Sequence, residues 1–248
     1  MSQLEVASRA EVSARHLSFV ETGRSLPSKE MILRLTAELD VSLRDRNRAL
    51  LAAGYAPAYA ERPLDAPELA SARAAIRQVL DAHNPFPALL VDRRWNIVDG
   101  NAGLAVLLSD VPAGLLEPPV NALRLTFHPE GLAARIDNLD EWREHVLARL
   151  RHQVAASDDE SLRELLRDLE TLGNDRSAGP RQLTPASAVS VPLRLRTADR
   201  ILSFLSITTV FGAPLDVTLT DLAIEAFYPA DESTAEFLNA SRRSLRQA

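Results

Sequence analysis

The 248-residue chain contains no cysteine, so it has neither a disulfide nor a thiolate ligand for a metal. No apolar run approaches the roughly 18–20 residues that are needed to cross a bilayer. Met1 is followed by polar residues rather than by the apolar stretch of a signal peptide. These absences predict a cytoplasmic protein that has no membrane partner.

The common signatures of enzyme sites are also missing. There is no Gly-x-Ser-x-Gly nucleophile motif, no glycine-rich phosphate loop and no His-Glu-x-x-His metal motif. The five histidines are scattered, and the pair His145 and His152, seven residues apart on one expected helix, has no evident third ligand. We therefore expect no catalytic residue, no metal site and no cofactor.

Residues 2–24 read as two short helices joined by a tight turn. Ser2 and Ser13 are each placed to cap a helix N-terminus, and Gly23 suits a helix stop. Each helix has one apolar side, formed by Leu4, Val6 and Ala7 in the first and by Leu17 and Val20 in the second. Two short helices at this spacing form a helix-turn-helix unit, whose second helix can lie in the DNA major groove.

The stretch SQLEVASRAEVSARHLSFVETGRSLPSKEMILRLTAELDVS resembles the helix-turn-helix of the phage-repressor (Xre) class of transcriptional regulators. The Ser-Gln opening, the Val-Ser turn, the Glu-x-Gly-Arg end and the Pro-Ser start of the next helix carry the resemblance. Repressors of this class have a further helix before the Ser-Gln pair. The expectation is therefore a DNA-binding domain truncated at its N-terminus, either because the helix was lost or because the start codon was assigned too late.

By the docking geometry of this class, the exposed residues early in the second helix face base edges. Because Leu17 and Val20 must face the core, the outward set is Ala14, Arg15, Ser18 and Phe19. Arg15 can offer two donors to a guanine edge, and the alternative is a solvated surface arginine. The residues suited to phosphate contacts are Gln3, Ser13, Arg24 and Ser25. Since one recognition helix reads a half-site, we expect a homodimer on double-stranded DNA.

The charge distribution is compatible with DNA binding but is not evidence for it. The whole chain has a net charge of -6, which does not draw it onto DNA. Residues 1–54, however, contain eight Lys or Arg against seven Asp or Glu, so the acidity lies downstream.

The chain as a whole predicts an α+β protein, with a small all-α domain followed by an antiparallel sheet covered by helices. We expect four helices within residues 1–54, a linker with three prolines over residues 55–67 and a second domain over residues 68–248. In the second domain the patterns predict helices over 69–83, 102–108, 139–154, 157–172, 219–227 and 233–245. They predict strands over 88–92, 95–99, 121–127, 189–196 and 201–211, and a polar loop over 173–185.

Three blocks of the second domain resemble the ligand-binding domain of MmyB-like transcription regulators: FPALLVDRRWNIVDGNAG, LEPPVNALRLTFHPEGLAARIDNLDEWREHVLARLRHQ and VSVPLRLRTADRILSFLSITTVFGAPLDVTLTDLAIEAFYPAD. The resemblance implies a PAS-like fold that encloses a cavity for fatty-acid-like ligands. It thus implies a regulator that couples binding of a small apolar ligand to operator binding. The only small molecule expected is a bound fatty acid as effector. The alternative is a ligand-binding or protein-interaction module whose truncated helix-turn-helix no longer binds DNA.

Such a cavity needs apolar walls and a few polar anchors. The candidate wall residues, taken from the inner faces of the expected strands and helices, are Leu90, Ile97, Leu125, Phe127, Trp142, Val146, Phe204 and Ile207. Arg124 and His128 are candidate anchors for a carboxylate head group. An apolar strand residue is ordinarily part of a core with or without a ligand, and His128, which precedes Pro129, also suits a turn-stabilising role.

Overall fold

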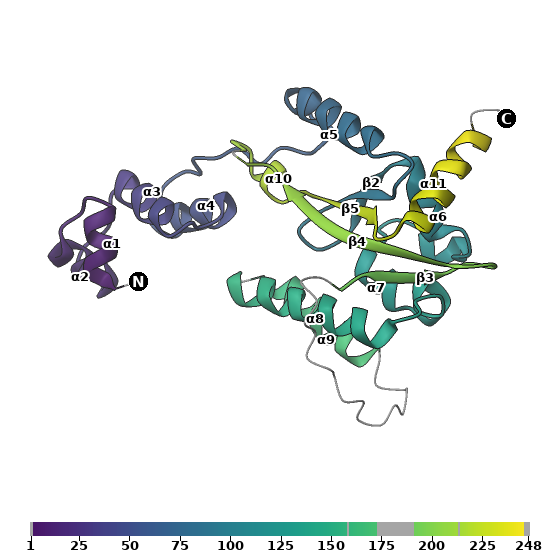
Figure 1. The fold of residues 1–248 in the computed structure, drawn as a ribbon. Helices are drawn as coiled ribbons and strands as arrows, with labels where there is room; N and C mark the ends of the chain where they lie inside the picture. Colours follow the sequence, from purple (N-terminus) through teal and green to yellow (C-terminus); the bar gives the residue numbers. More distant parts are fainter. Residues whose placement is uncertain (1, 158, 173–190, 213, 246–248) are drawn as a thin grey trace. The chain divides into compact units, whose positions relative to one another are not determined.

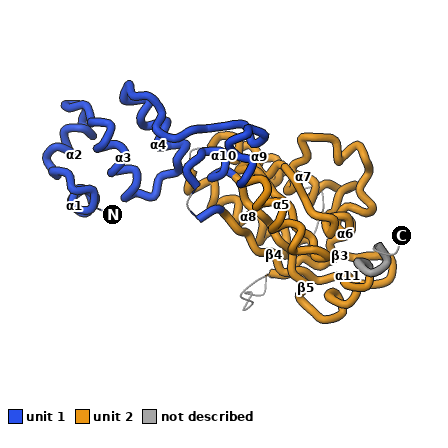
Figure 2. Tube along the Cα trace, turned by 90° about the horizontal axis from the view of Figure 1, so that it is seen from above, with its two compact units in different colours: residues 1–71, 211–221 blue, residues 72–210, 222–248 orange. Residues whose placement is uncertain are grey.

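The computed structural model describes residues 2–157, 159–172, 191–212 and 214–245. The chain divides into two compact units, each made of two stretches of sequence (Figure 2). Unit 1 comprises residues 1–71 and 211–221, and unit 2 comprises residues 72–210 and 222–248. The residues of the expected linker thus belong to unit 1, together with a short segment from within the expected second domain.

Unit 1 is built from short helices: α1 (Gln3–Arg9), α2 (Ala14–Glu21), α3 (Lys29–Glu38), α4 (Leu43–Ala52) and, in its second stretch, α10 (Val217–Thr220) (Figure 1). The first four confirm the expected helices, and each follows a serine whose hydroxyl accepts a hydrogen bond from a free backbone N–H: Ser2, Ser13, Ser28 and Ser42. Gly23 has φ 71°, the left-handed conformation in which glycine commonly ends a helix. Ala7, Leu17 and Met31 form the small core that holds α1, α2 and α3 together.

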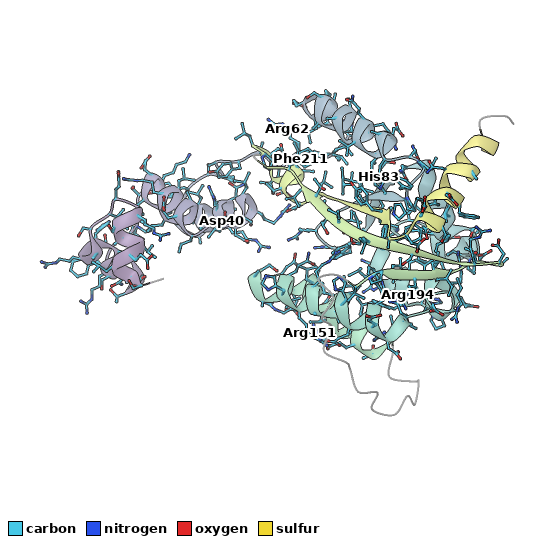
Figure 3. The ribbon with its side chains drawn as sticks, viewed as in Figure 1. Asp40, Arg62, His83, Arg151, Arg194 and Phe211 are labelled. Atoms are coloured by element: carbon cyan, nitrogen blue, oxygen red, sulfur yellow. The ribbon has the colours of Figure 1, made fainter. Side chains whose placement is uncertain are left out.

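The residues after α4 are fixed within unit 1 rather than free. Asn47 of α4 is buried, donates to the carbonyl of Tyr59 at 2.8 Å and accepts from the backbone N–H groups of Ala58 and Tyr59. The backbone N–H of Val217 donates to the carbonyl of Ala60 at 2.8 Å. Arg62, which Figure 3 labels together with Phe211, pairs with the buried Asp216 at 2.8 Å. Residues 211–221 are therefore tied to the helical unit although they connect two strands of unit 2.

Unit 2 is organised around a five-stranded antiparallel sheet, which confirms the expected α+β class. The strands lie in the order β2 (Ile97–Gly100), β1 (Ala88–Val91), β5 (Ala223–Pro229), β4 (Ile201–Val210) and β3 (Leu193–Arg196). In the register, Glu225 of β5 lies opposite Leu89 on one side and Thr208 on the other. Because side chains alternate along a strand, these three residues share one face of the sheet.

Helices cover the sheet, with α8 and α9 on one side and α5 on the other (Figure 1). Their bounds are η1 (Pro67–Leu69), α5 (Ala70–Ala82), η2 (Ala102–Leu104), α6 (Ala105–Leu108), η3 (Ala113–Leu116), α7 (Ala122–Phe127), η4 (Pro129–Ala133), α8 (Leu139–Ala156), α9 (Glu160–Thr171) and α11 (Glu232–Leu245). The main core packs between the sheet and α7, α8 and α9. None of the described helices is long and apolar enough to cross a membrane.

Two expected elements of the second domain are wrong. The expected strand over 121–127 is instead helix α7 (Ala122–Phe127), because Asn121 caps it by accepting from the backbone N–H of Arg124. Residues 223–229 form strand β5 rather than the end of a helix. This strand lies between β1 and β4 and is largely buried, so its nearly continuous apolar run does not show the alternation of a half-exposed strand. The expected loop over 173–185 and the start of the strand at 189 lie outside the described residues.

Candidate functional site

The second helix of the helix-turn-helix presents an arginine with unused hydrogen-bond donors. Arg15 is exposed, and its guanidinium lies over the ring of Phe19, 5.4 Å from the ring centroid. No carboxylate among the described residues pairs with Arg15, whereas Arg9 of α1 pairs with Glu5 at 2.9 Å. The stacking limits the orientations of the Arg15 side chain while its N–H groups remain available to a ligand.

The other residues expected at this surface have varied surroundings. Arg24 is exposed and, like Arg15, makes no ion pair with a described residue. The Gln3 side chain donates to Glu21, which ties the start of α1 to the end of α2. Ser13 is exposed and caps α2, while Ala14, Ser18, Phe19 and Ser25 are half-buried. Leu17 is buried as expected, and DNA contact by any of these side chains stays a prediction.

Unit 2 contains a cavity between the sheet and its covering helices. The volume of this cavity is about 60 Å³, which is small beside the roughly 300–1,000 Å³ of typical small-molecule sites. The lining residues are Leu89, Trp95, Ile97, Leu104, Leu107, Leu108, Ala122, Leu123, Leu125, Thr126, Leu132, Trp142, Val146, Arg149, Leu193, Glu225 and Phe227.

The polar side chains of the wall are concentrated at an ion pair between α8 and β5. Arg149 donates to the two carboxylate oxygens of Glu225, from Nη1 at 3.0 Å and from Nη2 at 3.1 Å. Glu225 also accepts from the hydroxyls of Ser206 and Thr208 on the neighbouring strand. The Glu225 side chain is only 6% exposed, so this network supplies the hydrogen bonds and the opposite charge that a buried carboxylate needs.

The Arg149 side chain also contacts an aromatic ring. The Arg149 guanidinium lies 4.4 Å from the ring centroid of Trp95, whose Nε1 donates to Gln153 at 3.0 Å. His145, one turn earlier on α8, stacks on Trp142 with ring centroids 5.4 Å apart. Burial lowers the pKa of His145, and the nearby charge of Arg149 lowers it further, although Glu225 acts in the opposite direction.

Four of the ten expected ligand residues lie in the cavity wall: Ile97, Leu125, Trp142 and Val146. Phe127 and Phe204 are buried in the surrounding core but do not line the cavity. Phe204 packs edge-on against Phe227, which does line it, with ring centroids 6.3 Å apart. Phe127 lies beneath the guanidinium of Arg143, which is 5.2 Å from its ring centroid.

The other four expected ligand residues point elsewhere. Leu90 and Ile207 lie on the opposite face of the sheet, since each is one residue away in register from the neighbours of Glu225. Arg124 is half-exposed and pairs with Asp168 of α9 at 2.5 Å, so it does not point into the cavity. The ring of His128 accepts from the backbone N–H of Glu130 at 3.1 Å, which is the turn-stabilising role that the sequence also allowed.

Sequence reasoning missed Arg149 and Glu225. Helical spacing offered a signal for Arg149, because it lies seven residues after Trp142 and three after Val146 on the same side of α8. Glu225 was hidden because its segment was expected to be a helix, so a carboxylate inside an apolar run was not seen as buried. No group of three or more His, Asp or Glu that could hold a metal occurs in the described part of the chain.

Comparison with known proteins agrees with this organisation. Residues 72–240 match the model of the MmyB-like transcription regulator ligand binding domain, and residues 1–45 match a helix-turn-helix model. No curated protein matches the chain. A solved structure of an RNA-binding light-oxygen-voltage receptor is 14% identical with a TM-score of 0.32, a likeness too weak to inform the fold. It covers 98% of this chain, which spans 57% of the receptor chain.

The match to the ligand-binding domain, over residues 72–240, covers most of the chain. The chain therefore belongs to the MmyB-like transcription regulator family, and it carries an Xre-type helix-turn-helix at its N-terminus.

Proposed function

We propose that this regulator binds a small apolar, fatty-acid-like ligand in unit 2 and thereby alters operator binding by unit 1. The observation that carries the proposal is the cavity, whose wall is apolar apart from Thr126, Arg149, Glu225 and the indole N–H groups of Trp95 and Trp142. An apolar site with a few localised polar groups is the usual design for a small hydrophobic ligand. The apolar wall suits the acyl chain of such a ligand.

The DNA side of the proposal rests on α2 and the residues that follow it. Arg15 and Arg24 are exposed cations without a carboxylate partner among the described residues. An arginine of this kind can bind a guanine edge or a phosphate without first breaking an ion pair. Because one such helix reads a half-site, the active form on DNA is a homodimer that reads two half-sites.

The coupling element is the segment over residues 211–221. It belongs to unit 1, where Asp221 binds Arg44 of α4 at 2.7 Å, and it continues directly into β5 of unit 2. Glu225, four residues after Asp221, lies in the cavity wall. A bound ligand can favour one position of the first residues of β5. Because residues 211–221 continue into β5, the same ligand then favours one position of residues 211–221 on α4.

Three measurements on the full chain test this function. Native mass spectrometry of the purified protein should show a lipid-sized adduct, or binding of dodecanoate or dodecanamide after extraction of bound lipid. Selection from randomised duplex DNA should enrich an inverted repeat. The affinity for the enriched duplex should differ between the lipid-loaded and the lipid-free protein. A protein that enriches no sequence would support the interaction-module alternative, and one that binds no lipid would refute the sensor.

A further inference from the structure

The charged part of the cavity wall is an ion pair in which every acceptor position of the carboxylate is occupied. A carboxylate has about four acceptor positions. On Glu225, two receive N–H groups of Arg149, and the other two receive the hydroxyls of Ser206 and Thr208. Glu225 therefore offers no free lone pair to a ligand.

Arg149 has donors to spare. A guanidinium carries five N–H groups. Nη1 uses its two on Glu225 and Thr208, and Nη2 uses one on Glu225. The Nε–H and the second hydrogen of Nη2 have no acceptor within the described residues. The two hydrogen bonds to Glu225 and the contact with the Trp95 ring limit the orientation of the guanidinium and of these two donors.

The ion pair in the cavity wall thus has free N–H donors but no net charge. A ligand carboxylate here would lose its hydration and would meet an arginine whose charge is already balanced by the more buried Glu225. The second anion would also repel Glu225 in a site of low polarity. A carbonyl oxygen without charge loses far less hydration and can accept from the free N–H groups of Arg149 equally well.

We propose that Glu225 makes the cavity select apolar ligands whose polar end is an uncharged hydrogen-bond acceptor, such as an acyl amide or ester, over the free carboxylate of the same chain. This inference rests on the proposed function, because it assigns the head group of the ligand bound in that cavity. Glu225 acts as a specificity-determining residue, since its carboxylate neutralises the Arg149 charge that would otherwise attract a ligand carboxylate.

The test compares two probes of nearly identical shape, dodecanamide and dodecanoate, at pH 7.5 with the full chain. The two tryptophans, Trp95 and Trp142, both line the cavity, so their fluorescence reports occupancy directly. For the wild-type protein we expect dodecanamide to bind at least about tenfold more tightly than dodecanoate. The wild-type comparison decides the proposal even if no variant folds.

The variant Glu225→Gln removes the carboxylate and leaves the Arg149 charge unbalanced. We expect its affinity for dodecanoate to rise at least about tenfold, so that the preference narrows or reverses. The matched control is Glu170→Gln, which removes an equivalent partner of Arg151 outside the cavity and should leave both affinities unchanged.

The results distinguish failure of the head-group inference from failure of the proposed ligand-binding function. Dodecanoate binding as tightly as dodecanamide to the wild type, or an unchanged preference in a folded Glu225→Gln variant, overturns the head-group inference alone. Failure of both probes to bind, with no lipid adduct in native mass spectrometry, overturns the apolar-ligand function and the inference with it.

Discussion

Arg44 of α4 donates from both Nε and Nη2 to a single carboxylate oxygen of Asp221, at 3.1 and 2.7 Å. Its Nη2 also pairs with Glu61 at 2.6 Å. Although burial opposes it, hydrogen bonding to Glu61 and Asp221 raises the pKa of Arg44 above its ordinary value, so the guanidinium is firmly charged. These contacts fasten the connection between β4 and β5 to a helix of the DNA-binding unit.

The first prediction concerns this fastening. In Arg44→Ala, the connection loses its direct ion pair with α4, so ligand binding should lose most of its effect on DNA affinity. Coupling free energies of about 1–3 kcal/mol are typical of such links, and the variant should reduce the coupling to a small fraction of the wild-type value. Ligand affinity should stay close to wild type, because Arg44 is not among the cavity residues. Fluorescence anisotropy with labelled operator, with and without ligand, measures both.

Arg48→Ala is the matched control for this variant. Arg48 lies one turn later on α4 and pairs with Asp45 of the same helix, so its removal leaves the connection to β5 intact. Full coupling in a folded Arg44→Ala protein would show that the signal does not pass through this contact.

The second prediction concerns DNA recognition. Arg15→Ala should weaken operator binding by about 1–3 kcal/mol and relax the preference at one base pair, as expected for loss of a contact to a guanine edge. Arg24→Ala should weaken binding equally for all sequences and reduce the salt dependence by about one counterion. Titrations of operator and scrambled duplex at several salt concentrations distinguish the two patterns.

Arg9→Ala serves as the control, because Arg9 is an exposed arginine of the same unit that is already paired with Glu5. If Arg15→Ala binds operator with unchanged affinity and specificity, Arg15 is a solvated surface residue.

The third prediction concerns the cavity. Ala122 lines it from α7, and replacement by leucine should place three additional carbon atoms in the narrow space. We expect Ala122→Leu to weaken dodecanamide binding at least about tenfold with little change in stability, since the added atoms fill free volume rather than displace core atoms. The control is Ala134→Leu at an exposed position. Equal ligand affinity in wild type and Ala122→Leu would exclude this cavity as the ligand site.

Much of the fold was predictable because its signals are local. The serine caps and apolar spacing in unit 1 predicted α1 to α4 correctly, and the helical segment expected over 102–108 follows Asn101, whose side chain caps it. Local patterns failed where burial on both sides removed the alternation, as in β5. They also could not place residues 211–221 with unit 1, because that assignment depends on contacts such as Arg44–Asp221 between residues 177 positions apart.

The cavity was predictable only in part for a similar reason. Trp142 and Val146 follow from helical spacing alone, whereas the face of a strand residue depends on the exact register of pairing. Leu90 and Ile207 were thus expected inside but lie on the other face of the sheet. The ion pair of Arg149 with Glu225 joins two distant elements, so no local pattern could reveal it.

The fourth prediction concerns stability. Asn101 is buried and makes four hydrogen bonds: it accepts from the backbone N–H groups of Ala88 and Leu104 and donates to the carbonyls of Leu80 and Phe86. Asn101→Ala leaves these groups without a partner and should lower the free energy of unfolding of unit 2 by about 2–3 kcal/mol. Urea unfolding followed by tryptophan fluorescence reports on unit 2, which holds both tryptophans. The exposed Asn239→Ala is the control, and an equally small effect of both substitutions would contradict the structural role of Asn101.

The last prediction concerns pH. Because burial and Arg149 lower the pKa of His145 in the folded protein, the unfolded chain takes up a proton near pH 6.5 before the folded one does. Stability should therefore fall as the pH drops from about 7 to 5, and His145→Gln should flatten this part of the profile. Asp159, Asp199 and Asp231 have lowered pKa values and titrate at still lower pH. Urea midpoints measured across this range test the prediction, with the exposed His152→Gln as control. An unchanged slope in His145→Gln would show that this imidazole titrates alike in both states.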